Sequence, residues 1–496
     1  SYSIGGNAMY KLTVLPHCIS CHVLPGSTIM AALRSNHIFL DSLCGGNGTC
    51  KKCQVIANGK TVLACRTIVD CNMTIELPET AALHVLQDGI CKKQEIDPEA
   101  PGYLIAFDIG TTSVVCFLLD PENGTELAKS SLLNPQTTFG ADVISRIQSA
   151  LHGSLEQETE AIRQGMSSLI QTVCRDAQIT PEEIGVVSVV GNPAMQQIFL
   201  GISPFNLTEI PFSPVLTEAK AVSCQKYLTI CPNAVLLIVP DISGYIGADT
   251  MSCLLATELY QKDETTLLVD IGTNGELVLG NKDQMVACST AAGPALEGAN
   301  LQCGMRGTNG AIDHVWLENG HIAYSVIGDG EALGLCGSGI IDAVAAGLEM
   351  GLLNRRGRIL NESHTFFITP HIYLTQDDIR QIQLAKGAIH AGISLMTKQL
   401  GLDITDIRKV LLAGAFGSHL RPESACRIGL LPEELLSRIT SVGNAAGSGA
   451  KMLACNKRLL PLTQQLAKNI TFTELASLEE FPKTFAKSMN FREVFP

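Results

Sequence analysis

The sequence predicts a multidomain α/β protein in which a small cysteine-rich domain precedes a larger part built from two related lobes. Eight of the 18 cysteines lie within the first 91 residues, so we expect a site built from cysteine side chains in the N-terminal part of the chain. An apolar strand that ends in Asp-Ile-Gly-Thr occurs twice, far apart in the chain, which indicates duplicated subdomains. The chain has 496 residues, of which 46% are apolar, and can therefore bury several cores.

The charge of the chain argues against two classes of partner, and its hydropathy predicts no membrane-spanning segment. The net charge is −13 and no basic stripe occurs, which argues against nucleic acid and against an anionic membrane. The sequence has no run of about 18 apolar residues, and its start lacks the segments of a signal peptide. We therefore expect a cytoplasmic protein, with residues 1–8 as a cloning remnant ahead of Met9.

Three closely spaced cysteines and one later cysteine predict an iron-sulfur site. Cys44, Cys50 and Cys53 follow the spacing C-x5-C-x2-C in a glycine-rich loop, and Cys65 lies in a later apolar segment. Glycine lets such a loop turn tightly and lets backbone N–H groups approach cluster sulfurs. Plant-type 2Fe-2S clusters use this arrangement with a first spacing of C-x4-C. The longer spacing resembles that of the adrenodoxin-type ferredoxins, which implies one 2Fe-2S cluster held by these four thiolates.

The surrounding residues predict a β-grasp, ferredoxin-like domain over residues 9–80 and a polar linker over residues 81–102. Residues 11–15 alternate as a strand, residues 16–22 are typical of a hairpin turn, and residues 27–33 are typical of the start of a helix. Proline and glycine interrupt the linker before the next apolar strand.

Other interpretations of the cysteines remain open. Four thiolates can also hold zinc, but structural zinc sites usually draw on two paired knuckles. Cys18 and Cys21 form a C-x2-C pair, which we interpret as an incidental surface pair. Cys71, in an alternating strand, is the reserve fourth ligand in place of Cys65.

Each copy of Asp-Ile-Gly-Thr predicts a phosphate-binding hairpin. An Asp at the end of an apolar strand would hold Mg2+ or its waters, and the turn after it presents backbone N–H groups and hydroxyls to a phosphate. Asp residues that only cap turns are the alternative. The predicted residues are Asp108, Gly110, Thr111 and Thr112 in the first hairpin and Asp270, Gly272, Thr273 and Asn274 in the second.

A third segment, residues 409–418, is an apolar strand that runs into small residues and can approach an adenosine closely. The order phosphate 1, phosphate 2, adenosine resembles the actin, hexokinase and heat-shock-chaperone ATPase superfamily. This resemblance implies a two-lobed RNase H-like fold that binds ATP. It places lobe I at 103–265, lobe II at 266–440, and a C-terminal helix and tail at 441–496 that returns to lobe I. The candidate adenosine contacts are Gly414, Ala415, Phe416 and Gly417.

Two further segments are candidates for the nucleotide site. Gly337 and Ser338 lie in a glycine turn that enters a helix, where N-terminal amides bind phosphate or ribose. Helix packing explains these glycines equally well. Lys386 lies on a helix predicted over residues 383–395 and would reach the adenine, with a solvated surface lysine as the alternative.

Beyond these motifs, the sequence resembles the reductive activases of corrinoid proteins over nearly its whole length. The resemblance rests on segments 134–136, 140–147, 190–195, 291–298 and 443–450. It implies ATP-dependent transfer of one electron from the cluster to a cobalt(II) corrinoid, which regenerates cobalt(I) for methyl transfer. The implied partners are a corrinoid protein or corrinoid-dependent methyltransferase component and a low-potential electron donor. A homodimer is expected on the same likeness.

Four more residues have candidate roles under this resemblance. Glu276 and Glu297 would position the attacking water or Mg2+, beside the two catalytic aspartates. The small-residue stretch 288–306 is the candidate for approaching the corrinoid, where Ser289 or Thr290 would offer cobalt a weak oxygen ligand. Alternatively, this stretch only completes the nucleotide cleft.

Two other functions fit the nucleotide motifs. A redox-regulated small-molecule kinase of the hexokinase superfamily would use the same clamp beside an acceptor pocket. An actin-like or chaperone module would use ATP as a conformational timer. Both leave the cysteine-rich domain unexplained.

Overall fold

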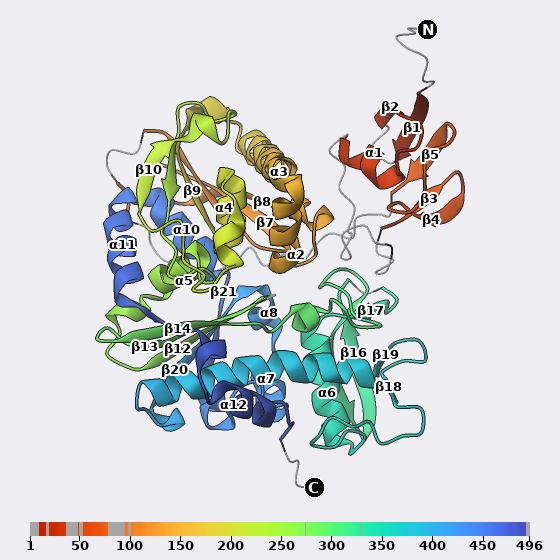
Figure 1. Ribbon diagram of the computed structural model, residues 1–496, viewed down its shortest axis with the longest axis vertical. Coiled ribbons are helices and arrows are strands. Elements are labelled where there is room, and N and C mark those ends of the chain that lie inside the picture. Colours follow the sequence, from red (N-terminus) through yellow and green to blue (C-terminus); the bar gives the residue numbers. More distant parts are fainter. Residues whose placement is uncertain are drawn as a thin grey trace.

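A computed structural model describes the chain over residues 9–15, 19–35, 48, 53–77, 95–97, 101–272, 274–328 and 330–492. Figure 1 shows a small N-terminal domain and two larger lobes. Within the described ranges, no helix combines the length and the apolar composition that a membrane span requires.

One five-stranded sheet and one helix form the N-terminal domain. The strands follow the order β2-β1-β5-β3-β4. Strands β1 and β5 are parallel, and the other neighbouring pairs are antiparallel. Residues 19–22, expected in a hairpin turn, instead belong to strand β2, which its β-branched residues favour. The elements are β1 (Tyr10–Leu15), β2 (Ile19–Val23), α1 (Ile29–Ser35), β3 (Gln54–Ala57), β4 (Lys60–Leu63) and β5 (Met73–Glu76).

Lobe I is a six-stranded sheet with helices on both faces. Its strand order is β10-β11-β9-β6-β7-β8. Successive residues of a strand point to opposite faces, and on β6 this places Ile105 and Phe107 in the core under α3 and α4. Ala106 faces the other core, with α5 and α10. The elements are β6 (Tyr103–Ile109), β7 (Ser113–Leu119), β8 (Glu126–Leu133), α2 (Val143–Ser149), α3 (Leu155–Asp176), β9 (Ile184–Gly191), α4 (Pro193–Leu200), β10 (Lys220–Ser223), β11 (Val235–Ile238) and α5 (Ala248–Thr257).

Lobe II repeats this plan. Its sheet order is β21-β20-β12-β13-β14-β22. The hairpins β6-β7-β8 and β12-β13-β14 are both antiparallel, and in each lobe a later strand, β9 or β20, joins the first strand in parallel. The duplication predicted from the repeated motif is therefore present in the topology. The elements are β12 (Thr266–Ile271), β13 (Gly275–Gly280), β14 (Met285–Thr290), β20 (Lys409–Ala413), α8 (Gly414–His419), α9 (Pro422–Arg427), β21 (Ile439–Gly443) and α10 (Ala445–Cys455).

Further elements extend lobe II. Helix α7 covers the outer face of its sheet, and helix α6 packs on β15 in one of two small sheets beside it (Figure 1). The helices are α6 (Gly337–Glu349) and α7 (Gln376–Gln399). The strands are β15 (Ala311–Glu318), β16 (His321–Val326), β17 (Gly334–Leu335), β18 (Thr365–Phe367) and β19 (Tyr373–Thr375).

The C-terminal segment crosses between the lobes. Helices α10 and α11 (Leu460–Asn469) share a core with lobe I. The tail beyond them, expected on lobe I, instead joins lobe II. Strand β22 (Thr471–Phe472) pairs with β14, and α12 (Phe481–Ser488) packs on α7. This difference has a physical reason, because Phe491 fills the lobe II core.

Two helices, α5 and α10, lie between the sheets of the two lobes. Their apolar residues share one core with strands of both sheets. They cross at close range, since a Cβ atom at Gly449 would lie 2.1 Å from the carbonyl oxygen of Ser252. Only glycine permits this approach. A rotation of one lobe against the other must therefore change the packing of α5 on α10.

Candidate functional site

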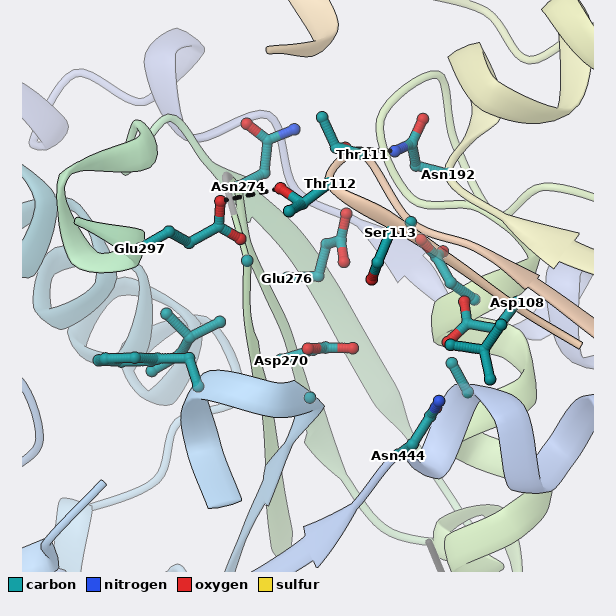
Figure 2. A pocket seen from close by; sticks show the side chains of 18 residues that line it. Asp108, Thr111, Thr112, Ser113, Asn192, Asp270, Asn274, Glu276, Glu297 and Asn444 are labelled. Carbon is teal, nitrogen blue, oxygen red and sulfur yellow. Dashed lines mark hydrogen bonds between the residues drawn. The ribbon is translucent and has the colours of Figure 1, made fainter. Parts of the chain in front are cut away.

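A cleft between the two lobes gathers the ends of the duplicated hairpins. Figure 2 shows its polar side chains pointing toward one another from both lobes. The lining also includes the first residues of α5, α8 and α10. The lining residues are Asp108, Gly110, Thr111, Thr112, Ser113, Val115, Asn192, Asp249, Asp270, Ile271, Gly272, Asn274, Glu276, Glu297, Gly414, Phe416, Asn444 and Ala446.

The first hairpin turn is held by one hydrogen bond within it and by two asparagines from neighbouring segments. The backbone N–H of Gly110 donates to the carbonyl oxygen of Ser113 at 2.9 Å. The side-chain amide of Asn134 donates to the carbonyl oxygen of Gly110 at 2.7 Å. The side-chain amide of Asn192 donates to the hydroxyl of Thr111 at 3.2 Å. These bonds fix a turn whose N–H groups and hydroxyls border the cleft, as a phosphate site requires.

The second hairpin places two carboxylates on one face. Asp270 on β12 is directly opposite Glu276 on β13, so both side chains point into the cleft. Gly414 follows the neighbouring strand with φ +83°, and a Cβ atom there would lie 2.6 Å from Oδ1 of Asp270. The segment after β20 therefore approaches the aspartate through a glycine that no other residue can replace without strain.

Burial and mutual repulsion raise the pKa values of the cleft carboxyls. Burial raises the pKa of Asp108 to about 7, against a lowering by a hydrogen bond from Asn444, and Asp270 raises it further. Burial also raises the pKa of Asp249 to about 7 and that of Asp270 to about 6. The pKa of Glu276 is raised well above its ordinary value, first by burial. Acids crowded in this way are stabilised as anions by a bound cation.

The donor set fits Mg2+ held with a phosphate ligand. Carboxylate oxygens are what Mg2+ prefers, and it usually takes only one or two of them, with waters and substrate phosphates completing its shell. Among the residues that the structure describes, no three metal-binding side chains converge closely enough to form a complete site by themselves. Asp108 and Asp270 would therefore share the ion with the nucleotide.

Seven of the lining residues were not among the sequence-based candidates, and three of these, Asp249, Asn192 and Asn444, are acidic or amide residues at helix starts. Asp249 begins α5, and its Oδ1 accepts the N–H of Thr250 at 2.8 Å. Asn192 and Asn444 cap the helices α4 and α10, which begin at the cleft. Both asparagines lie in segments that carry the family resemblance. The start of a helix within each segment could have identified them as candidates. Asp249 had no comparable signal, because its place depends on the packing of α5.

Several predicted nucleotide residues lie elsewhere. Lys386 is buried on α7, and its amine donates to the backbone carbonyl of Asn490, not into the cleft. Gly337 and Ser338 do not line the cleft, and a Cβ at Gly337 would lie 2.0 Å from the Leu296 carbonyl oxygen. Packing therefore explains this glycine. Gly417 packs on β20, the side chain of Ala415 is not described, and Thr273 lies outside the described residues.

One of the two corrinoid-facing candidates is buried. Thr290 is 2% exposed, and its hydroxyl donates to the Gly275 carbonyl oxygen at 3.1 Å within the hairpin. The expectation that Thr290 ligates cobalt is therefore wrong. Ser289 is half-buried opposite Glu276. Glu297 does line the cleft, where its Oε2 accepts the hydroxyl of Thr112 at 3.4 Å (Figure 2).

Two of the four predicted cluster ligands lie side by side in the N-terminal domain. The Sγ atoms of Cys53 and Cys65 are 3.3 Å apart, and both side chains are buried. Two thiolates on one tetrahedral metal at about 2.3 Å would lie about 3.8 Å apart, so this pair fits a shared metal with little movement. Cys71 is exposed. Cys44 and Cys50 lie outside the described residues.

The raised pKa values predict an unusual pH dependence of stability. Because these carboxyls titrate above the ordinary value near about 4, the folded protein binds more protons than the unfolded chain between roughly pH 4 and 7. The free energy of unfolding without Mg2+ should therefore fall as pH rises through this range. We expect thermal unfolding midpoints to decline from pH 5 to pH 8, and magnesium with a nonhydrolysable ATP analogue to offset the decline. A pH dependence unchanged in Asp249→Asn would contradict this explanation.

The duplicated lobes and their shared carboxylate cleft define an actin- and hexokinase-like, or ASKHA, class of protein. Residues 264–494 match the family described as the C-terminal domain of RACo, the ASKHA domain, and residues 103–262 match the RACo middle region. The sequence is 38% identical over 424 residues to the corrinoid activation enzyme RamQ of Eubacterium limosum, covering 80% of this chain and 71% of RamQ. The chain therefore belongs to the family of corrinoid activation enzymes.

Two other proteins that are similar to this chain also have names that refer to corrinoid proteins. The sequence is 26% identical over 429 residues to the Co(II) methylated amine-specific corrinoid protein reductase of Methanosarcina barkeri, covering 78% of this chain and 77% of that protein. A solved structure of a reductive activator for a corrinoid, iron-sulfur protein has a TM-score of 0.71 and 26% identity, covering 97% and 98% of the two chains. The ASKHA fold and the resemblance to corrinoid activases, both predicted from the sequence, are confirmed.

Proposed function

We propose that this chain couples ATP turnover to the reduction of a cobalt(II) corrinoid on a partner protein, with one electron passing from a 2Fe-2S cluster in its N-terminal domain. The observation that carries the proposal is the cleft, in which equivalent hairpins of two lobes direct Asp108 and Asp270 toward one site. Family membership supplies the corrinoid chemistry, since the relatives are named for activating or reducing corrinoid proteins.

The nucleotide would lie across both lobes. Its phosphates would contact Thr111 and Thr112 on lobe I and the turn at Gly272 and Asn274 on lobe II, all of which line the cleft. Its adenosine would lie against Gly414 and Phe416, which line the same cleft. Glu276 and Glu297 would orient the attacking water or the waters on Mg2+.

The N-terminal domain supports a cluster of the ferredoxin type. Its five-stranded mixed sheet with one helix is consistent with a β-grasp, ferredoxin-like domain, and its paired thiols at Cys53 and Cys65 fit one tetrahedral metal. Cys44 and Cys50 would complete the set. A bound 2Fe-2S cluster of the plant type stores one electron near about −400 mV.

Reduction of cobalt(II) to cobalt(I) is expected to be uphill from that potential. Each 59 mV of unfavourable gap costs about 1.4 kcal/mol for one electron. ATP would close the gap by selecting a conformation of the complex in which the corrinoid loses an axial ligand and is easier to reduce. The α5 and α10 crossing connects the nucleotide cleft to the relative position of the lobes.

The test mixes the purified chain, ATP, Mg2+, a low-potential reductant and a cobalt(II) corrinoid protein, and follows the cobalt(I) absorbance. We expect cobalt(I) to accumulate with ATP and not with a nonhydrolysable analogue. Accumulation that is independent of ATP would overturn the proposal. ATP turnover that responds to a small-molecule acceptor and not to the corrinoid protein would favour a kinase.

The partners follow from this function. We propose a corrinoid protein or methyltransferase component as acceptor, a low-potential donor to the cluster, a cytoplasmic setting and a homodimer formed through the ATPase lobes. Light scattering of the purified chain would measure the last of these directly.

A further inference from the structure

A buried arginine lies directly behind the first phosphate-binding turn. Arg146 is on α2 and is 0% exposed. Its Nη2 donates to the carbonyl oxygen of Thr111 in the turn, its Nε donates to the carbonyl oxygen of Gly140 at 3.0 Å, and its Nη1 contacts Sδ of Met195 at 3.2 Å. The guanidinium fork thus ties the turn to α2 and α4.

The chain around Arg146 is built to bring it there. Helix α2 is capped by Asp142, which accepts the N–H of Ser145 at 2.7 Å. A Cβ atom at Gly140 would lie 2.3 Å from Oγ of Ser145 and 2.8 Å from the backbone nitrogen of Arg146, so only glycine allows the chain to fold back onto the helix. This explains the Gly140 to Ile147 segment, which the nucleotide contacts leave unused.

Burial of the charged guanidinium of Arg146 costs free energy. Burial lowers its pKa to about 9, while the charges of Glu158, Asp142 and Glu297 raise it and that of Arg306 lowers it. Burial also raises the pKa of Glu158 to about 7, while Ser149 and the charge of Arg146 lower it. A position that needed only packing would be better filled by an apolar side chain, because burying a charge costs free energy.

We propose that Arg146 is a positioning residue for the nucleotide phosphates, which fixes the first phosphate-binding turn from behind and adds positive charge to it. The inference rests on the nucleotide site of the proposed function. The Nη2 donor of Arg146 holds the carbonyl oxygen of Thr111 and so fixes the conformation of the turn. Thr111 and Thr112 line the cleft, where their N–H groups would bind a phosphate, and the cation favours the negative charge that arrives.

The experiment measures binding of a nonhydrolysable ATP analogue with Mg2+, and of adenosine, to the full chain by calorimetry. Arg146→Lys keeps the charge and loses the fork, and Arg146→Gln loses the charge. Both should weaken binding of the ATP analogue by about 10- to 100-fold, the value of a charge-assisted hydrogen bond. Adenosine affinity should stay within about two-fold, because adenosine does not use the turn.

Two control variants distinguish positioning from packing. Glu158→Gln removes the neighbouring charge but leaves the bonds of Arg146, so binding should be retained or tightened. Arg163→Lys alters another half-buried arginine of lobe I, whose Nε donates to the Phe199 carbonyl oxygen at 2.9 Å, away from the cleft. It should leave both affinities unchanged. Thermal unfolding without ligand shows whether each variant is folded.

The outcomes separate this inference from the proposed function. Folded Arg146 variants that bind the ATP analogue as tightly as the wild type would overturn it. Equal losses of adenosine and ATP-analogue affinity would also overturn it, since they would indicate general distortion. If Arg146→Gln does not fold, Arg146→Lys and the double variant Arg146→Gln/Glu158→Gln decide the question. Wild-type protein that binds no nucleotide would refute the proposed function itself.

Discussion

Replacing Asp270 with asparagine should lower ATP turnover by about 100-fold or more, the loss expected when a preorganised charge is removed from an active site. Asp270 lies near the end of β12 and lines the cleft, so close to Gly414 that an added Cβ atom there would lie 2.6 Å from its Oδ1. Asparagine keeps its volume and removes the charge that would hold Mg2+ or its waters. Steady-state turnover with saturating Mg2+ measures the effect.

The same substitution should make the metal-free protein more stable to heat. Burial and the charge of Glu297 raise the pKa of Asp270 to about 6, against a lowering by the thiol of Cys253, so its ionisation costs more free energy in the folded protein than in the unfolded chain. Removing one anion relieves this repulsion. Lower turnover with a higher unfolding midpoint is the signature of a charge retained for function at the expense of stability.

A matched control lies in the segment that leads into β12. Asp263 has a side chain 87% exposed and pairs with Lys282 at the surface. Asp263→Asn should leave turnover and the unfolding midpoint unchanged. If Asp270→Asn turned over ATP as fast as Asp263→Asn, Asp270 would not hold the metal, and the assignment of the cleft would be wrong.

Local sequence patterns predicted the duplicated hairpins because each is defined within about a dozen neighbouring residues. An apolar strand, an Asp at its end and a glycine turn determine where the carboxylate points without reference to the rest of the chain. Asp108, Asp270 and Gly414 accordingly lie where the motifs placed them. Asp249 escaped notice because it reaches the cleft only through the packing of α5 between the two sheets.

The misplaced candidates failed for the same reason. Lys386 was expected either at the adenine or in solvent, and it is neither, because the C-terminal tail covers that face of α7 and supplies Asn490 as its partner. The pairing of β22 with β14, which directs the tail to lobe II, joins segments remote in sequence. Thr290 reads as a loop residue by composition, but the ladder with β13 buries it.

Replacing Cys65 with serine should abolish the visible absorbance of the 2Fe-2S cluster, while replacing Cys71 should not. The sequence predicts Cys65 as the fourth ligand, with Cys71 as the reserve. Cys65 has its sulfur 3.3 Å from that of Cys53 in the buried core of the N-terminal domain, whereas Cys71 is exposed. A serine hydroxyl is a poor ligand for iron compared with a thiolate, so the cluster should be lost or fail to assemble.

The measurement combines the visible spectrum with iron, zinc and labile sulfide content of the full chain. Nucleotide affinity should be unchanged in Cys65→Ser, because the cleft lies entirely within the lobes. Loss of the cluster in Cys71→Ser, with retention in Cys65→Ser, would reverse the ligand assignment. Zinc without iron in the wild type would mean that the N-terminal domain cannot store an electron. ATP turnover in the cleft could then not serve electron transfer from this domain, and the proposed function would be wrong.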